Sequence, residues 1–461
     1  MKYDAIILGA GLSGLAAGIR LACYDKKVCI VEKHVEIGGL NSFYQMENRW
    51  FDVGLHAMTN YTPKGVRSSP LGKLLKQLRF KHEDFQLCQQ KESEISFPGV
   101  SLRFSNDFEL LRQEISEKFP RQIDGFDRLT KQIQEHDDLS LKSGFLSSRS
   151  VLAEYLTEPK LAEMLFCPLM FYGNPQADDM DFTQFTIMFK AIFLEGFAKP
   201  LGGMRHILKL LADKYKGYGG ELRLGRAVKT INITSEEVQS VTLAKGEELQ
   251  AEIVISSIGY AETMRLCAPE KFPEDTLKDG EISFVESQYV VDVQPSEIGY
   301  DKSIVFFNTK DDFSYRKPKE MVDLDSGIVC CANNFDYPEK QEGLIRFTFL
   351  ANPDLWFGLA RSEYKEAKSY WQQKTLETIV GFLPDFRDSV VFLDTFTPKT
   401  IKKFTGHVNG AVYGSPVKIR DGKTPVKNLF ICGTDQGFLG IIGATLSGVT
   451  VANIYGLKAS Y

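Results

Sequence analysis

The first forty residues carry the clearest pattern of apolar and polar positions in the chain. The run Lys2-Tyr3-Asp4-Ala5-Ile6-Ile7-Leu8 predicts a short buried strand, and residues 15–23 predict a helix after a glycine-rich turn. A second apolar run, Lys27-Val28-Cys29-Ile30-Val31, predicts another strand and ends at the acidic Glu32. We therefore expect a β-α-β unit at the start of the chain.

Blocks of helical and strand pattern alternate further along. Apolar stripes predict a helix over 68–79, a hairpin at 95–104 and mostly helical structure over 107–197. A helix over 204–215 then precedes four expected strands, at 219–224, 227–231, 238–243 and 252–256. This second α/β region is expected to rejoin the first.

The carboxy-terminal part of the chain reads mainly as a second sheet. Runs rich in β-branched and aromatic residues predict antiparallel strands at 287–293, 304–308, 327–332 and 344–350. A long helix is expected over 362–382, capped by Ser362 and stopped by Pro384. A buried strand at 428–433 and a small-residue helix over 440–455 complete the predicted elements.

A glycine motif, Gly9-Ala10-Gly11-Leu12-Ser13-Gly14, lies between the first predicted strand and the first predicted helix. Its first glycine permits a tight turn, its second lets backbone approach a pyrophosphate, and its third lets helix and strand pack closely. The helix N-terminus offers unpaired N–H groups to the phosphates. Glu32 can accept the two hydroxyls of an adenosine ribose. In this context the motif predicts dinucleotide binding.

The pair Gly38-Gly39 follows shortly after Glu32, within Glu36-Ile37-Gly38-Gly39-Leu40. A Gly-Gly pair at this place extends the nucleotide cradle in FAD proteins, and nicotinamide-only dehydrogenases usually lack it. We therefore expect FAD as the cofactor. The fold class is then α/β: a Rossmann-type FAD-binding domain with an inserted α+β substrate domain made of an antiparallel sheet and helices. The expected boundaries are 1–80, 200–275 and 400–461 for the first domain, and 81–199 and 276–399 for the second.

Composition narrows the function class. The chain has 461 residues and a formal net charge of −5, which gives no reason to expect a nucleic-acid partner. Its eight cysteines form no CxxC pair and no metal spacing, so we expect no metal site and a reducing, cytoplasmic location. The start of the chain reads as a strand and not as a signal peptide. No apolar window reaches the roughly 20 residues of a membrane span. The 33 phenylalanines suggest an apolar cavity, an apolar partner or a Phe-rich core.

Four sequence blocks together resemble one branch of the FAD-dependent oxidoreductases. They are Gly9–Gly14 with Glu32 and Gly38-Gly39; Pro200-Leu201-Gly202-Gly203-Met204 with Gly219-Gly220 and Ala227-Val228; Phe396-Thr397-Pro398-Lys399-Thr400 with Gly410-Ala411-Val412-Tyr413-Gly414; and Gly433-Thr434-Asp435 with Gly440, Gly443-Ala444 and Ser447-Gly448. The chain resembles the phytoene desaturase, carotenoid isomerase and retinol saturase branch, which is related more distantly to amine oxidases.

The resemblance implies which residues hold FAD. Val228 would present its backbone to the adenine, Gly203 and Met204 would approach the flavin ring, and Asp435 would bond the ribityl or pyrophosphate region. The helix that starts near Gly440 would point its N-terminus at the flavin. The whole implied set is Gly9, Gly11, Leu12, Ser13, Gly14, Glu32, Lys33, Gly38, Gly39, Leu40, Gly203, Met204, Val228, Gly433, Asp435, Gly440, Ile441 and Ile442.

Two residues are candidates for a catalytic role. His56 is either a proton donor, a substrate contact or a hydrogen-bonded structural histidine. Tyr413 either lines the substrate cavity or packs in the core. Arg205 is either near the flavin or on the surface. Asp178, Asp179 and Asp181 read as a solvated loop, and 182–197 as either a core helix or a lipid or tunnel contact.

The expected function is that of an FAD-dependent oxidoreductase or isomerase acting on carbon–carbon bonds of an apolar polyene, isoprenoid or acyl chain. Hydride would pass between substrate carbon and flavin N5. The protein would then sit in the cytoplasm, in contact with a membrane surface. A flavin amine oxidase is the alternative, and a non-catalytic flavin- or lipid-binding protein is the alternative of another class.

Overall fold

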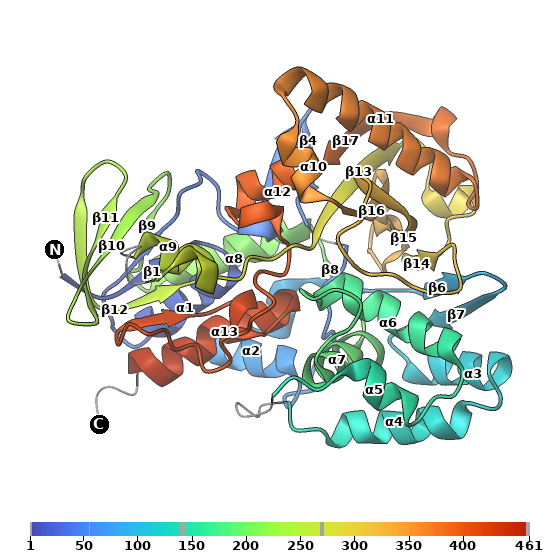
Figure 1. The fold of residues 1–461 in the computed structure, drawn as a ribbon, viewed down its shortest axis with the longest axis horizontal. Helices are drawn as coiled ribbons and strands as arrows, with labels where there is room; N and C mark the ends of the chain where they lie inside the picture. Colours follow the sequence, from blue (N-terminus) through green and yellow to red (C-terminus); the bar gives the residue numbers. More distant parts are fainter. Residues whose placement is uncertain (1, 55, 139–143, 268–271, 458–461) are drawn as a thin grey trace.

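Two seven-stranded sheets organise the protein in the computed structural model, which describes residues 2–54, 56–138, 144–267 and 272–457 (Figure 1). The first sheet has the order β10-β11-β12-β1-β2-β9, with β18 paired to β12. Its strands are β1 (Lys2–Leu8), β2 (Val28–Val31), β9 (Glu221–Arg223), β10 (Val228–Thr234), β11 (Glu237–Leu243), β12 (Glu248–Ser256) and β18 (Leu429–Ile431). The pairs β18–β12–β1–β2–β9 are parallel, and β10 and β11 extend the sheet antiparallel.

The predicted β-α-β unit is confirmed. Its helix, α1 (Leu12–Ala22), begins three residues earlier than expected, because helical geometry starts directly after the extended Gly11. The close packing that the motif requires is present: a Cβ added to Gly14 would lie 2.1 Å from the carbonyl oxygen of Gly9. A side chain at position 14 would therefore push α1 away from the turn.

Helices cover both faces of the first sheet. They are α1, α2 (Pro70–Leu78), α8 (Gly203–Gly217), α9 (Tyr260–Leu266) and α13 (Gly440–Val451). Helix α13 lies directly on α1, where a Cβ on Gly448 would be 2.0 Å from the Ser13 carbonyl oxygen. With the π-helical turn Ala452–Leu457, it forms an 18-residue stretch that is long and apolar enough to cross a membrane, but half of it is buried in the protein. The packing on α1 identifies it as a core helix.

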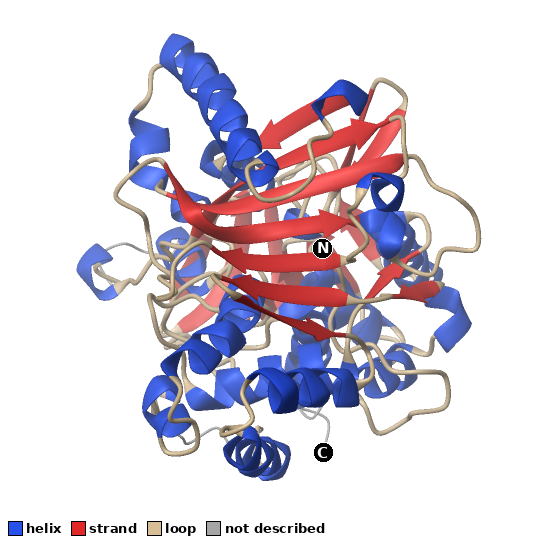
Figure 2. Cartoon of the chain, turned by 90° about the vertical axis from the view of Figure 1, so that its right-hand side faces the viewer, coloured by secondary structure: helices blue, strands red, loops and turns tan. Residues whose placement is uncertain are grey.

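The second sheet has the order β17-β13-β16-β15-β14-β6-β7 (Figure 2). Its strands are β6 (Ser93–Phe97), β7 (Val100–Phe104), β13 (Ser283–Val291), β14 (Ile304–Asn308), β15 (Val322–Cys331), β16 (Gly343–Ala351) and β17 (Val390–Phe396). The predicted antiparallel pairing holds except between β6 and β14, which are parallel. Strand β17 was not among the predicted strands.

Helices pack on both faces of the second sheet. One layer holds α3 (Phe108–Lys118), α4 (Ile123–Glu135), α5 (Ser148–Ala153), α6 (Pro159–Gly173) and α7 (Phe182–Phe189), and the other holds α10 (Pro353–Gly358) and α11 (Arg361–Val380). The alternation of β16 separates the faces: Ile345, Phe347 and Phe349 pack toward α11, whereas Arg346 and Thr348 belong to the opposite face. The Phe-rich stretch 182–197 is buried, which favours the core interpretation over lipid contact.

Helix α11 begins differently from the prediction. Ala360 is its N-cap, and the backbone N–H of Ala360 donates to Glu363 Oε2 at 2.8 Å. Ser362 lies inside the first turn, so its predicted role as the cap is wrong. A carboxylate three residues after the cap performs the capping here.

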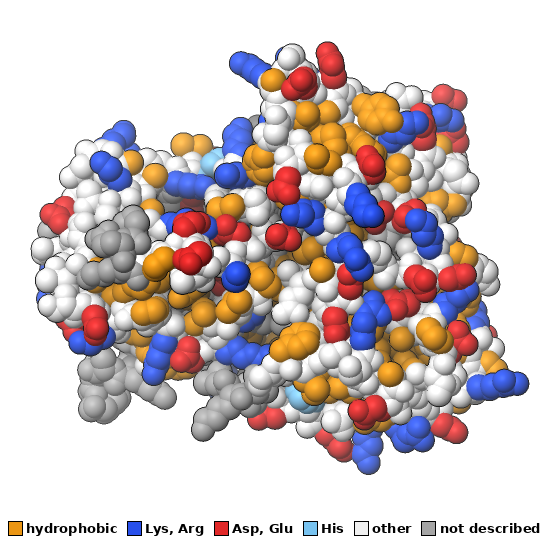
Figure 3. All heavy atoms as spheres, viewed as in Figure 1, with side chains coloured by type: hydrophobic (Ala, Val, Ile, Leu, Met, Phe, Trp, Pro, Cys, Tyr) orange, Lys and Arg blue, Asp and Glu red, His pale blue; other side chains and the backbone are white. Residues whose placement is uncertain are grey.

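Two small sheets join the larger units: β3 (Phe43–Met46) with β4 (Arg49–Asp52), and β5 (Leu87–Gln89) with β8 (Ala198–Pro200). Helix α12 (Pro398–Thr405) follows β17 and lies between the large sheets. The first sheet takes its strands from 2–31, 221–256 and 429–431, and the second takes them from 93–104 and 283–396. The exact domain boundaries stay a prediction. On the face in Figure 3, acidic and basic side chains are interspersed.

Candidate active site

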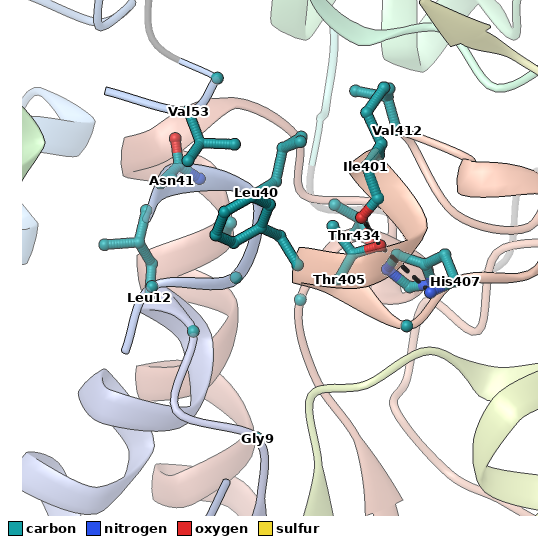
Figure 4. Close-up of a pocket in the computed structure, with 18 of the residues that line it drawn as sticks. Gly9, Leu12, Leu40, Asn41, Val53, Ile401, Thr405, His407, Val412 and Thr434 are labelled. Atoms are coloured by element: carbon teal, nitrogen blue, oxygen red, sulfur yellow. Dashed lines mark hydrogen bonds between the residues drawn. The ribbon is translucent and has the colours of Figure 1, made fainter. Parts of the chain in front are cut away.

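A cavity of about 400 Å³ lies between the two sheets and is lined by residues of both. Leu12, Leu40 and Val53 form one wall, and the facing wall comes from α12 and the segment after it (Figure 4). Segments more than 300 residues apart in the chain therefore meet across this space.

The glycine motif forms the floor of the cavity. Gly9, Gly11, Leu12 and Ser13 line it, and the first turn of α1 carries neither an acidic residue nor a side-chain cap. Its N–H groups are thus left for a ligand. A Cβ added to Gly11 or to Gly39 would meet no protein atom within 4 Å, so both glycines face open space. This cradle fits a diphosphate.

Glu32 stands at the end of β2, where the ribose of a dinucleotide is expected. It is buried but lines the cavity; its Oε2 accepts from the Ala10 N–H at 2.8 Å and its Oε1 accepts from the His34 N–H at 2.8 Å. Two backbone bonds thus fix the carboxylate. Lys33 and Val228 line the same part, and burial lowers the pKa of Lys33.

Most of the predicted cofactor residues line this one cavity. They are Gly9, Gly11, Leu12, Ser13, Glu32, Lys33, Gly38, Gly39, Leu40, Val228, Gly433, Gly440 and Ile441. Gly14 and Ile442 instead pack in the core beneath them. The two helix N-termini, of α1 and α13, both open onto the cavity, and neither has a side-chain cap.

Three further predicted residues, Gly203, Met204 and Asp435, also lie outside the lining. Gly203, with φ +69°, backs onto Asp52, and the Met204 N–H donates to Asp52 Oδ1 at 2.9 Å. Asp435 is buried; its oxygens accept from the Ser415 N–H at 2.8 Å and the Tyr260 N–H at 2.6 Å. These groups hold loops together beside the cavity, and their direct contact with the cofactor stays a prediction.

A histidine–carboxylate pair at the nucleotide end was not predicted. His407, from the loop after α12, places Nδ1 3.0 Å from Glu262 Oε1 of α9, and both line the cavity. Burial disfavours the charged imidazole, but Glu262 raises the pKa of His407. The pair joins residues 145 positions apart, and no local pattern announces such a contact.

A second polar cluster lies where the cavity meets the second sheet. His56 Nε2 is 2.6 Å from Thr348 Oγ1 and 3.3 Å from Glu286 Oε2, and all three residues line the cavity. Beneath them, Arg346 donates to Glu286 Oε1. Among these, sequence reasoning found only His56. The sequence signal that could have revealed Glu286 and Arg346 was a charged residue within each of two largely apolar runs.

The register of the second sheet explains why these groups meet. Glu286 of β13 pairs with Thr348 of β16, and two residues further along β13 Gln288 pairs with Arg346. Burial opposes ionisation of Glu286, but the guanidinium of Arg346 and His56 lower its pKa to about 2. Burial lowers the pKa of His56, which favours the neutral imidazole.

Two tyrosines complete this end of the cavity. The hydroxyl of Tyr413 donates to the carbonyl oxygen of Phe171, and burial raises its pKa. The hydroxyl of Tyr172 is buried, and its proton has no acceptor in the described part of the chain; only the backbone N–H of Ala57 is directed at its oxygen. Both tyrosines line the cavity.

The remaining candidates lie elsewhere. Arg205 stacks on the ring of Trp50 at 4.5 Å and does not line the cavity. Asp178 accepts from the Tyr315 N–H, and Asp181 pairs with Arg420 at 2.6 Å. The described ranges contain no group of three His, Cys, Asp or Glu residues that could hold a metal ion.

Comparison with known proteins agrees with this architecture. The family description "Flavin containing amine oxidoreductase" matches residues 12–281, more than half of the chain. The chain is 23% identical to prolycopene isomerase of Arabidopsis thaliana over 98% of its own length and 82% of that protein's length. It is 21% identical to all-trans-retinol 13,14-reductase of Danio rerio, covering 98% and 85% of the two chains.

A solved structure supports the fold. Putrescine oxidase superimposes with a TM-score of 0.65 at 18% identity, covering 98% of both chains. The names of the two curated relatives fit the carotenoid isomerase and retinol saturase branch, so the resemblance found in the sequence blocks is confirmed. The chain belongs to the flavin-containing amine oxidoreductase family, and it is an FAD-dependent oxidoreductase.

Proposed function

We propose that the protein acts on carbon–carbon bonds of an apolar polyene, isoprenoid or acyl substrate, as a desaturase, a saturase or an isomerase. One observation carries the proposal: the cavity continues from the glycine cradle into a wall of Phe171, Phe284, Ile328 and Val412. The curated relatives named above support it, because their names denote a polyene isomerase and a retinol reductase. An apolar wall beside a cofactor cradle suits an apolar chain.

FAD, when bound, supplies hydride exchange with a substrate carbon. The chain's own residues bind and orient the reactants. The uncapped first turns of α1 and α13 would offer N–H groups to the bound cofactor, and their dipoles would stabilise negative charge on it. Gly433, Gly440 and Ile441 line the cavity from the carboxy-terminal side.

His56 and Tyr413 are the two side chains we assign to the substrate. Both line the cavity beside apolar residues. His56 is held through Nε2 by Thr348 and Glu286, which would leave Nδ1 to accept a proton or a hydrogen bond from the substrate. Tyr413 is fixed by its bond to Phe171 and would shape the wall.

The substrate class suggests where the protein works. We propose that it is cytoplasmic and collects an apolar substrate at a membrane surface. We also propose that the two sheets are the centres of an FAD-binding and a substrate-binding domain, with the cavity at their junction.

The test is anaerobic incubation of oxidised and reduced holoenzyme with a lipid extract, followed by mass spectrometry. We expect one lipid class to lose or gain two mass units, or to change retention at constant mass. If no lipid changes under either condition while the flavin stays redox-active, the proposal is wrong.

A flavin amine oxidase is the second candidate, favoured by the family description and by the likeness to putrescine oxidase. It predicts that polyamines or aromatic amines bleach the flavin and that air restores the colour with release of peroxide. A protein that binds lipid but turns over neither class would be a carrier.

A further inference from the structure

The substrate end of the cavity contains buried polar side chains in apolar surroundings. His56, Thr348 and Glu286 line it together with Phe171 and Phe284. Polar groups that face a hydrocarbon without a partner cost free energy. A few convergent polar groups in an apolar pocket generally fix the orientation of a ligand that can bond to them.

The bonds within the cluster leave one side of His56 unused. The hydroxyl of Thr348 donates to Glu286 Oε2 at 3.1 Å, and this hydroxyl has only one proton. His56 must therefore donate through Nε2 to Thr348 Oγ1 at 2.6 Å. This network assigns the tautomer in which Nδ1 is an acceptor, and no described residue bonds to that atom.

Tyr172 supplies a second, independent group. Its hydroxyl is buried; the backbone N–H of Ala57 is directed at its oxygen, and its proton finds no acceptor among the residues that the structure describes. Its ring lies 6.2 Å from the His56 ring, and it lines the same cavity. Two neighbouring rings of the cavity wall thus carry a hydroxyl with an unused proton and an imidazole nitrogen with an unused lone pair.

The fixed charges around these groups balance. Arg346 pairs with Glu286. The buried Lys199 donates to the backbone carbonyl oxygen of His56 at 3.0 Å, and Asp52 is an opposite charge near it. Burial lowers the pKa of Lys199 and raises that of Asp52, so both shifts move toward neutral forms. A carboxylate or an ammonium on a ligand would find no unmatched counter-charge.

We infer that the substrate is an apolar chain that carries a neutral hydroxyl group, which donates to His56 Nδ1 and accepts from the Tyr172 hydroxyl at the end of the cavity. This inference rests on the proposed function. It narrows the substrate class by excluding bare hydrocarbons, fatty acids and amines as the preferred ligand.

The experiment compares two probe pairs on the oxidised holoenzyme, with binding followed by the shift of the flavin spectrum. The first pair is geranylgeraniol and the hydrocarbon of the same skeleton; the second is hexadecanol and hexadecane. We expect the alcohol of at least one pair to bind roughly tenfold tighter or more, because the hydrocarbon leaves buried polar groups unpaired. Tyr172→Phe and Thr348→Val should each shrink that ratio several-fold.

Thr395→Val is the matched control. Thr395 is a buried threonine of the same sheet, bonded to Ser287 Oγ at 2.9 Å, and it does not line the cavity, so the ratio should stay unchanged. Equal affinity for alcohol and hydrocarbon in the native enzyme, or a ratio that neither cavity variant changes, overturns the inference and leaves the proposed function standing. If no probe of either pair perturbs the flavin, the proposed function falls as well.

Discussion

Arg346 is a cation with only 1% of its surface exposed, on a strand that is otherwise apolar. It is tolerated because Glu286 accepts its N–H groups and the Val53 carbonyl accepts another at 3.3 Å. A buried pair of this kind gives little net stability compared with apolar residues, but each partner needs the other. Its value here is that it fixes Glu286, and through it His56, beside the cavity.

Glu286→Gln should therefore destabilise the holoenzyme strongly, by about 3–5 kcal/mol, since it leaves the Arg346 charge buried without its counter-ion. Thermal and urea unfolding of the two proteins would measure this loss. The double variant Glu286→Gln/Arg346→Met should recover much of it. A single variant as stable as the native protein would contradict this account of the pair.

The same pair sets an acid limit on stability. The folded pKa of Glu286 is about 2, below its ordinary value of 4.5, so its contribution is complete above about pH 4.5 and is lost as the pH falls toward 2. The native protein should therefore lose more stability than the double variant between about pH 4.5 and about pH 2. If the two proteins lost the same stability over this pH range, Glu286 would not be the main acid-sensitive group.

At the scale of elements, α12 and the loop after it form a wall over the nucleotide half of the cavity, joined to α9 by His407 and Glu262. Gly259, with φ +105°, permits this contact, because a Cβ there would lie 2.2 Å from Glu262 Oε2. Lys33 and Asp435 are the other charged groups near the imidazole.

The titration of His407 predicts that FAD binding weakens as the pH rises. The folded pKa of His407 is raised above 6.5, so its contribution is complete below about pH 6.5 and is lost as the pH rises through the folded value. The pKa of Glu262 is lowered from 4.5, so its carboxylate stays ionised and its contribution to the pair stays complete down to about pH 4.5. The rate of FAD release should rise roughly tenfold between about pH 6 and about pH 9.

His407→Gln should release FAD fast at both pH values. His82→Gln is the matched control, since His82 bonds to the Thr62 carbonyl outside the cavity lining and should keep the native pH dependence. A His407 variant with the native profile would show that another group titrates.

The packing of α13 on α1 gives a second prediction at this scale. Gly448→Leu should displace α13, because even a Cβ would lie 2.0 Å from the Ser13 carbonyl oxygen, and the flavin-to-protein absorbance ratio of the purified enzyme should drop. Ile454→Ser, at a residue that is 37% exposed near the end of the same helical stretch, should leave that ratio and any membrane binding unchanged. If Ile454→Ser abolished membrane binding instead, this helix would be a membrane contact.

For the whole molecule, the cofactor site joins two sheets that contact the same cavity from opposite sides. A ligand that binds only the folded protein stabilises it by mass action, by about 4 kcal/mol at a thousand times its dissociation constant. Removing FAD should lower the melting temperature by several degrees, and adding FAD back should restore it. An apoprotein as stable as the holoenzyme would show that FAD binding does not stabilise the junction of the two sheets.

Sequence alone determined the nucleotide half of this protein. Residues Gly9 to Glu32 are close in the chain, their β-α-β periodicity is local, and each glycine performs its task within a few residues of the others; the structure follows that prediction closely. The same holds for the helix that begins at Gly440.

Which side chains meet at the substrate end of the cavity could be determined only from the tertiary structure. His56, Glu286, Arg346 and Thr348 come from distant segments, and their meeting depends on the register between β13 and β16 and on how that sheet faces β4. The pair of His407 and Glu262 likewise forms only when α12 closes over the first sheet. Such contacts follow from long-range packing, which leaves no periodic trace in the chain, and so the sequence singles out His56 alone and only the folded protein shows the residues that it meets.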